Sequence, residues 1–247
     1  MQRARYLIGF LMGAIWLVVC CLFGFLLLPF GRRERLPVHL FAKLLCGGIT
    51  AAVGWRVQVE NPEGLVAARP CVFVANHQSF VDVVLYGMVV PKGTVAAGKR
   101  EIASIPFFGW FFRASGNILL DRGNPSQTTA ALHRAARIIR EDRVSVWMMP
   151  EGHRNDGKTL LPFRSGAFRL AAAAGVPIVP VVAEPISAVA DTKRMLARRG
   201  VFRVRVLEPI PTGSAATPMK MNQLVERARN RMQKAFDELS AEVPSSR

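Results

Sequence analysis

Acidic residues are scarce in this 247-residue chain, which holds 17 aspartates and glutamates against 33 lysines and arginines and has a formal net charge of +16. Such an excess of positive charge predicts anionic partners, namely nucleic acid, acidic lipid surfaces or phosphorylated substrates. Hydrophobic residues make up 51% of the sequence. A basic chain that is so apolar fits a membrane better than nucleic acid, so we expect membrane lipids and no nucleic acid as partners.

Cysteine and histidine are also few. No Cys-x-x-Cys pair occurs among the four cysteines, which argues against a disulfide framework and a zinc site and favours a reducing compartment. The four histidines are dispersed along the chain. We therefore expect no metal site and no cofactor.

Charged residues are absent from the stretch 6–30. As a helix this stretch would be roughly 37 Å long at about 1.5 Å per residue, which is enough for a bilayer core of about 30 Å. It is too long for the apolar part of a signal peptide, and no small-residue cleavage site follows it. The sequence therefore predicts an N-terminal membrane-embedded helical segment.

A second apolar stretch, 36–55, carries only His39 and Lys43 as potential charges. The two stretches could form a helical hairpin that dips into one leaflet with both ends cytoplasmic. Alternatively, the first is a single span and the second a buried amphipathic helix. Basic residues flank the first stretch on both sides, so the positive-inside rule does not fix its orientation.

From residue 55 onward, short runs rich in β-branched residues alternate with helical patterns. The expected strands, each bounded by turn residues, are 56–59, 71–75, 94–97, 117–120, 145–149, 178–183 and 202–207. The expected helices are 80–89, 126–142 and 217–239. This alternation predicts an α/β domain with a mainly parallel sheet flanked by helices. We expect three parts, which are membrane helices at 1–54, the α/β domain at 55–242 and a tail at 243–247.

His77 and Asp82 form the first candidate catalytic pair. Asn76 and His77 follow an apolar strand, at the edge where open α/β sheets bind their ligands. With His77 in the loop and Asp82 in the first turn of the next helix, the carboxylate can reach back and hold the imidazole as a general base. Two alternatives stay open, because Ser79 and Asp82 also fit a capping box and His77 could be an ordinary loop histidine.

Two further strand ends carry ionisable residues. Glu151 and Arg154 follow the strand 145–149, so they should lie at the same edge as His77. Arg122 follows the strand 117–120, where the alternative is a solvated arginine paired with a neighbouring aspartate.

Lys99 lies in a segment that differs from a P-loop by one residue. In Gly93-x-x-x-x-Gly98-Lys99-Arg100, arginine stands where a serine or threonine would hold Mg²⁺, so nucleotide hydrolysis is not expected. Lys99 is still a candidate to contact a phosphate as a point charge.

Taken together, these segments resemble the bacterial 1-acyl-sn-glycerol-3-phosphate (lysophosphatidic acid) acyltransferase family. The resemblance extends over about residues 75–181. Its motifs occur in the family's order, and they are Asn-His-x4-Asp, Gly-Lys-x-Glu with Pro106-Phe107-Phe108-Gly109, Gly-x5-Arg, Pro-Glu-Gly-x-Arg and Val176-Pro177-Ile178-Val179-Pro180. One such motif would be weak, but five in order are specific.

The resemblance implies an acyl transfer from acyl-CoA or acyl carrier protein to the sn-2 hydroxyl of lysophosphatidic acid, giving phosphatidic acid in phospholipid biosynthesis. It implies His77 as the base and Asp82 as its orienting partner. Other roles would fall to Lys99, Arg122 and Arg154, which would hold the phosphate, and to Glu151 and Gly152, which would line the acceptor pocket. His153 stands where threonine is commoner in the family, so it receives no role.

Alternatives to this function remain within and outside the enzyme class. The acceptor could instead be glycerol 3-phosphate, a lysophospholipid or an aminolipid. A non-catalytic membrane module that binds anionic lipid would also agree with the basic charge. For the family's reaction, we expect the bacterial inner (cytoplasmic) membrane, with the catalytic domain facing the cytoplasm.

Overall fold

The computed structural model describes residues 2–30, 35–155, 159–191, 194, 196–213 and 217–243, with side chains from residue 11 onward. A seven-stranded sheet in the order β1-β9-β6-β2-β5-β3-β4 forms its centre. The strands are β1 (Trp55–Glu60), β2 (Val72–Ala75), β3 (Thr94–Lys99), β4 (Ile118–Leu120), β5 (Ser145–Met148), β6 (Ile178–Ala183) and β9 (Gly200–Val206). Every strand expected from the sequence is present, with small differences at the ends. Most of the expected tail lies outside the described residues.

Five of the six strand pairings in this sheet are parallel, and only the pairing of β6 with β9 is antiparallel. All residues of β2, β5 and β6 are buried, as expected for central strands that helices cover on both faces. The expected α/β fold with a mainly parallel sheet is therefore confirmed.

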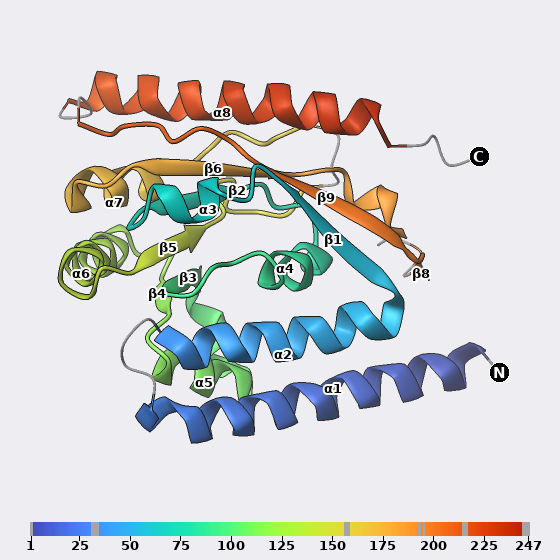
Figure 1. The fold of residues 1–247 in the computed structure, drawn as a ribbon. Helices are drawn as coiled ribbons and strands as arrows, with labels where there is room; N and C mark the ends of the chain where they lie inside the picture. The colour runs from blue at the N-terminus through green and yellow to red at the C-terminus, as the bar shows by residue number, and fades with distance from the viewer. Residues whose placement is uncertain are drawn as a thin grey trace.

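Three helices cover one face of the sheet (Figure 1). They are α6 (Pro125–Asp142), α7 (Gly166–Ala174) and α8 (Pro218–Ala241). Asn124 caps α6 by accepting a hydrogen bond from the Gln127 amide, and Pro125 occupies the first turn, where its missing N–H costs nothing. The sequence predicted α6 and α8 but not α7.

The opposite face carries α4 (Phe80–Gly87) and, outside it, α2 (Leu36–Val53) and α1 (Gln2–Leu27), which run antiparallel as the lowest layers of Figure 1. The short helix α5 (Phe108–Ala114) packs against α1. Connecting elements are α3 (Gly64–Ala67), the 3-10 turns η1 (Leu28–Phe30), η3 (Arg100–Ser104) and η4 (Ile186–Ala188), and a small β7 (Ala190–Asp191) and β8 (Leu196–Ala197) pair.

The N-terminal helices are apolar and expose much of their surface. The segments Leu11–Phe30 and Leu36–Val53 are long and apolar enough to cross a membrane, and only 17% and 22% of their most apolar windows are buried. A core helix of a soluble protein would be mostly buried, so this exposure favours membrane association. The two helices form a hairpin, with α2 packed between α1 and α4.

The connections that leave two neighbouring strands diverge at one edge of the sheet. β2 and β5 are neighbours, but β2 continues through α4 on one face to β3, whereas β5 continues through α7 on the other face to β6. The loops that leave β2 and β5 therefore diverge. Such a switch point, at the carboxyl ends of the strands, is where open α/β sheets place their ligand sites.

Candidate active site

His77 lies in the loop that leaves β2 at this switch point. Its Nδ1 is 3.1 Å from Oδ2 of Asp82, and the two side chains are 18% and 1% exposed. Because the carboxylate faces Nδ1, the Nε2 atom is the ring nitrogen left for a substrate. The contact expected from the sequence is therefore present.

Asp82 also caps the helix that follows. Ser79 and Asp82 form a capping box at the start of α4, and Oδ2 of Asp82 accepts hydrogen bonds from the amides of Gln78 and Ser79. Capping and holding His77 are thus simultaneous tasks of one buried carboxylate. The two amides and the His77 imidazole contact the same carboxylate oxygen, so the cap of α4 also fixes the orientation of the ring.

The loop after β5 holds the backbone of His77 from both sides. Oε1 of Glu151 accepts from the His77 amide at 2.7 Å, while the Asn155 amide donates to the His77 carbonyl at 3.0 Å. Oε2 of Glu151 accepts from the Leu161 amide at 2.9 Å. Glu151 is 3% exposed, and burial raises the pKa of its carboxyl although these amides oppose the shift. This carboxylate, which the resemblance assigns to the acceptor pocket, is bonded to the backbone of the histidine loop.

A second network joins the His77 loop to β6. The side chain of Asn76 exchanges two hydrogen bonds with the backbone of Ala183, and the Tyr86 hydroxyl donates to Oδ1 of Asn76 at 2.8 Å. Burial, helped by the charges of Asp82 and Glu151, raises the pKa of Tyr86, so its phenol stays protonated and can donate. Tyr86 was not singled out by the sequence motifs, although it lies one helical turn after Asp82.

Gly152 and Arg122 connect the β4 end to the same loop. Arg122 donates a hydrogen bond to the Gly152 carbonyl. Gly152 has a φ of +74°, which favours glycine, and a Cβ there would lie 2.6 Å from Nε of Arg164. Arg164 lies beside this turn, and no spacing in the sequence indicated it.

The candidate phosphate ligands form a more open group. Burial, then the charge of Arg164, lowers the pKa of Arg122, and the charge of Glu101 opposes this shift. Lys99, at the end of β3, pairs with Glu101 at 2.7 Å, and both side chains are more than half exposed. Lys99, Glu101, Arg122 and Arg164 therefore share one electrostatic neighbourhood.

Arg154 is exposed and lies next to Asn155. Among the described residues its guanidinium has no hydrogen bond or ion pair. Arg154 is thus an exposed cation beside the residue whose amide bonds to the His77 carbonyl.

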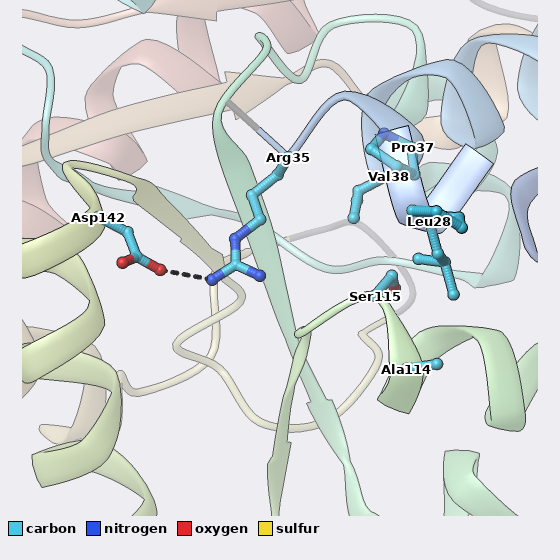
Figure 2. A pocket seen from close by; sticks show the side chains of 8 residues that line it. Leu28, Arg35, Pro37, Val38, Ala114, Ser115 and Asp142 are labelled. Atoms are coloured by element: carbon cyan, nitrogen blue, oxygen red, sulfur yellow. Dashed lines mark hydrogen bonds and ion pairs between the residues drawn. The ribbon is translucent and has the colours of Figure 1, made fainter. Parts of the chain in front are cut away.

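A separate cavity of about 700 Å³ lies at the opposite edge of the sheet (Figure 2). Its walls include Arg35 at the start of α2, Ser115 just before β4 and Asp142 at the end of α6. Arg35 and Asp142 form an ion pair of 2.7 Å across it. The cavity adjoins the amino ends of β4 and β5, so it is distinct from the His77 site. No cluster of three potential metal-ligating side chains occurs among the described residues.

Comparison with known proteins defines the class. The model of a family described as Acyltransferase matches residues 56–184, a span that contains His77, Asp82, Lys99, Arg122, Glu151, Gly152 and Arg154. The solved 1-acyl-sn-glycerophosphate acyltransferase of Thermotoga maritima has the same fold, with a TM-score of 0.74 and 21% identity over the full length of both chains.

Curated relatives narrow the class to one family. The 1-acyl-sn-glycerol-3-phosphate acyltransferase of Escherichia coli is 31% identical over 96% of both chains. That of Haemophilus influenzae is 34% identical over 80% of this chain and 81% of its own. The human beta enzyme is 39% identical over 76% of this chain and 67% of its own. The chain belongs to the 1-acyl-sn-glycerol-3-phosphate acyltransferase family.

Proposed function

We propose that this protein transfers an acyl chain to the free sn-2 hydroxyl of 1-acyl-sn-glycerol 3-phosphate and so makes phosphatidic acid. The observation that carries the proposal is the Nδ1–Oδ2 contact of 3.1 Å between His77 and Asp82 at the β2–β5 switch point. The names of the curated relatives agree with this substrate. An acyl thioester, carried by coenzyme A or acyl carrier protein, is the proposed donor.

In this mechanism His77 is the general base. Nε2 accepts the proton of the acceptor hydroxyl while the oxygen attacks the thioester carbonyl. Asp82 fixes the tautomer and stabilises the imidazolium that forms. When the tetrahedral intermediate collapses, the carbon–sulfur bond breaks and the proton passes to the departing sulfur. The products are an ester and a free thiol, and no acyl-enzyme forms because the acceptor is itself the nucleophile.

Phosphate binding by Lys99, Arg122 and Arg154 positions the hydroxyl. Lys99 ends β3, while Arg122 and Arg154 follow β4 and β5, so the three cations lie at neighbouring strand ends. An acceptor held at its phosphate brings the hydroxyl to Nε2 in one orientation, which makes the reaction effectively unimolecular. Glu151 and Gly152 shape the turn beside this acceptor site.

A membrane location completes the proposal. The division into membrane helices at 1–54, a catalytic domain at 55–242 and a tail at 243–247 places the apolar hairpin before the α/β domain. Lysophosphatidic acid and phosphatidic acid are both lipids, so a site at the bilayer surface avoids their transfer into water. We place the protein at the bacterial inner membrane with its catalytic domain in the cytoplasm, where the thioester donors are.

An acceptor panel tests the proposed reaction. The purified full chain receives one radiolabelled acyl-CoA and, in separate reactions, lysophosphatidic acid, glycerol 3-phosphate, a lysophospholipid without a free phosphate monoester, or an aminolipid. We expect label chiefly in phosphatidic acid. Label chiefly in another product would show that the protein uses a different acceptor. Lipid binding without any labelled product would overturn the proposed enzyme function. Acyl carrier protein loaded with the same chain distinguishes the two donors.

A further inference from the structure

The segment that follows Lys99 exposes large apolar side chains. Ile105, just after η3, is 43% exposed, and Trp110 of α5 is 55% exposed. We call these two residues the Trp110 patch. The outward side of α1 is similarly apolar, since Met12, Ile15 and Leu26 are 65%, 58% and 71% exposed. Exposed apolar side chains that gather on neighbouring elements indicate a binding surface.

The Trp110 patch and α1 belong to one packed layer. Phe111, 1% exposed, has its ring 5.6 Å from that of Phe25 in α1 and 4.5 Å from that of Phe41 in α2. Gly24 makes room for this ring, because a Cβ there would lie 2.6 Å from it. Phe111 thus fixes α5 on α1, and Trp110, about 100° away around the helix, remains on the outer side.

A constrained turn holds Trp110 in place. Phe107 has a φ of +60° and a ψ of −57°, which a bulky residue adopts only where its surroundings enforce it. The Phe108 amide bonds to the Pro106 carbonyl across this turn, and the rings of Phe107 and Trp110 pack 5.4 Å apart. Gly109 is required beside it, because a Cβ would lie 2.2 Å from the Ile102 carbonyl oxygen. The exposure of Trp110 is therefore a property of a defined local structure.

The composition of the patch identifies the partner. Tryptophan combines an apolar ring with an N–H donor and is suited to the boundary between acyl chains and headgroups. Arg113, exposed one turn later on α5, supplies a positive charge for anionic headgroups. η3 begins at Arg100, directly after Lys99, so the patch is continuous in the chain with the candidate phosphate ligands.

We propose that an anionic lipid bilayer covers the Trp110 patch, so that η3 and α5 enter the interfacial layer beside α1 and set Lys99 at the depth of the headgroup phosphates. This inference rests on the proposed membrane-bound acyl transfer and adds a third membrane-contacting element to the two N-terminal helices. The patch would then help to deliver the acceptor, because the headgroup phosphate of a lipid in that leaflet lies at the same depth as Lys99.

Tryptophan quenching by brominated lipids tests the contact directly. Trp55 and Trp147 are 8% and 5% exposed, so the full chain with Trp16→Phe has Trp110 as its one well-exposed tryptophan. It is compared with Trp16→Phe/Trp110→Phe in phosphatidylcholine–phosphatidylglycerol vesicles brominated near the glycerol. We expect quenching of the emission component that the second substitution removes. If the Trp110 emission is not quenched, the proposal is overturned. It is also overturned if Trp110 is shielded from solvent by a second copy of the chain and not by the bilayer.

Kinetics separate this surface from the reaction itself. For Trp110→Glu we expect the apparent KM for lysophosphatidic acid in vesicles to rise about tenfold, through loss of favourable contact with the bilayer. Activity on a water-soluble short-chain acceptor should change less than about twofold, since that acceptor needs no bilayer. Met219→Glu is the matched control, because Met219 is 68% exposed on α8, on the opposite face of the sheet. Equal losses on both acceptors would overturn the delivery role. If the parent chain acylates neither acceptor, the proposed function is wrong. The quenching experiment still tests whether Trp110 contacts the bilayer.

Discussion

Two groups of functional side chains differ in how firmly the structure holds them, namely the buried carboxylates around His77 and the exposed candidate phosphate ligands. Asp82 and Glu151 are almost completely buried and accept several backbone hydrogen bonds. Lys99 is 53% exposed with one ion pair, and Arg154 is exposed. The difference suggests a division of work, in which a buried network fixes the base and exposed cations bind the acceptor. A base needs a fixed geometry, whereas a charged clamp can close around its ligand.

The largest expected effect is on the firmly held side. His77→Ala should lower kcat by about 10²- to 10⁴-fold, because it removes the general base. The variant should stay folded and membrane-bound, since the hydrogen bonds of Glu151 and Asn155 reach the backbone of His77 and not its side chain. Turnover with a saturating acceptor and circular dichroism are the measurements. His133→Ala, at an exposed position on α6, is the control, and turnover near the parent value in His77→Ala would remove the proposed mechanism.

A smaller effect is expected on the open side. Lys99→Ala or Arg154→Ala should raise the KM for lysophosphatidic acid by roughly 10- to 100-fold, because a hydrogen bond to a charged group contributes about 1.5–3 kcal/mol. Lys99 must leave Glu101 to meet a phosphate, so its effect should be the lower of the two. The measurement is initial rate against acceptor concentration at a fixed donor level.

Arg100 is the matched control for these cations. It lies beside Lys99 but forms an ion pair of 2.7 Å with Asp121 and is 64% exposed. Arg100→Ala should leave the acceptor KM within about fivefold, since exposed ion pairs contribute at most about 1 kcal/mol. If Arg100→Ala and Lys99→Ala raise KM equally, general positive charge rather than a specific clamp attracts the substrate, and the contrast between the two regions weakens.

Local patterns account for the elements that the sequence predicted. β-branched runs bounded by turns indicated every strand of the main sheet, and Asn124-Pro125 indicated the start of α6. The His77–Asp82 contact was predictable because a helix cap constrains both residues within one short segment. These features depend on neighbours in sequence.

Long-range pairings account for what the sequence did not predict. The antiparallel position of β9 beside β6 depends on strand order, which no single segment encodes. α5 and α7 have only seven and nine residues, so each offers too few turns for a strong periodic signal in the sequence. The clamp of Glu151 on His77 joins residues 74 positions apart, and a motif indicates that a glutamate matters without indicating what it contacts.

The smallest effect, and the sharpest test of the firm region, concerns Glu151. Glutamine keeps one acceptor oxygen but presents an amide where the second carboxylate oxygen accepts from the Leu161 amide. Glu151→Gln should therefore reduce the free energy of unfolding by about 1–3 kcal/mol. It should lower kcat more than it raises the acceptor KM, because the displaced group is the His77 loop and not the phosphate site. A change in KM alone would place Glu151 with the acceptor instead.

The pH dependence of this loss adds an independent check, because burial raises the pKa of Glu151 above its ordinary value of 4.5. Between 4.5 and the raised pKa, the folded chain holds a proton that the unfolded chain has released, so stability falls as pH rises through this interval. Glutamine does not titrate, so the variant lacks this pH-dependent contribution to the free energy of unfolding. The stability difference between the parent chain and Glu151→Gln should therefore be largest at or below pH 4.5 and should shrink as pH rises through the raised pKa. Denaturant unfolding of both chains across this range measures it, and a difference that grows with pH would mean that hydrogen bonds to the ionised carboxylate outweigh its burial.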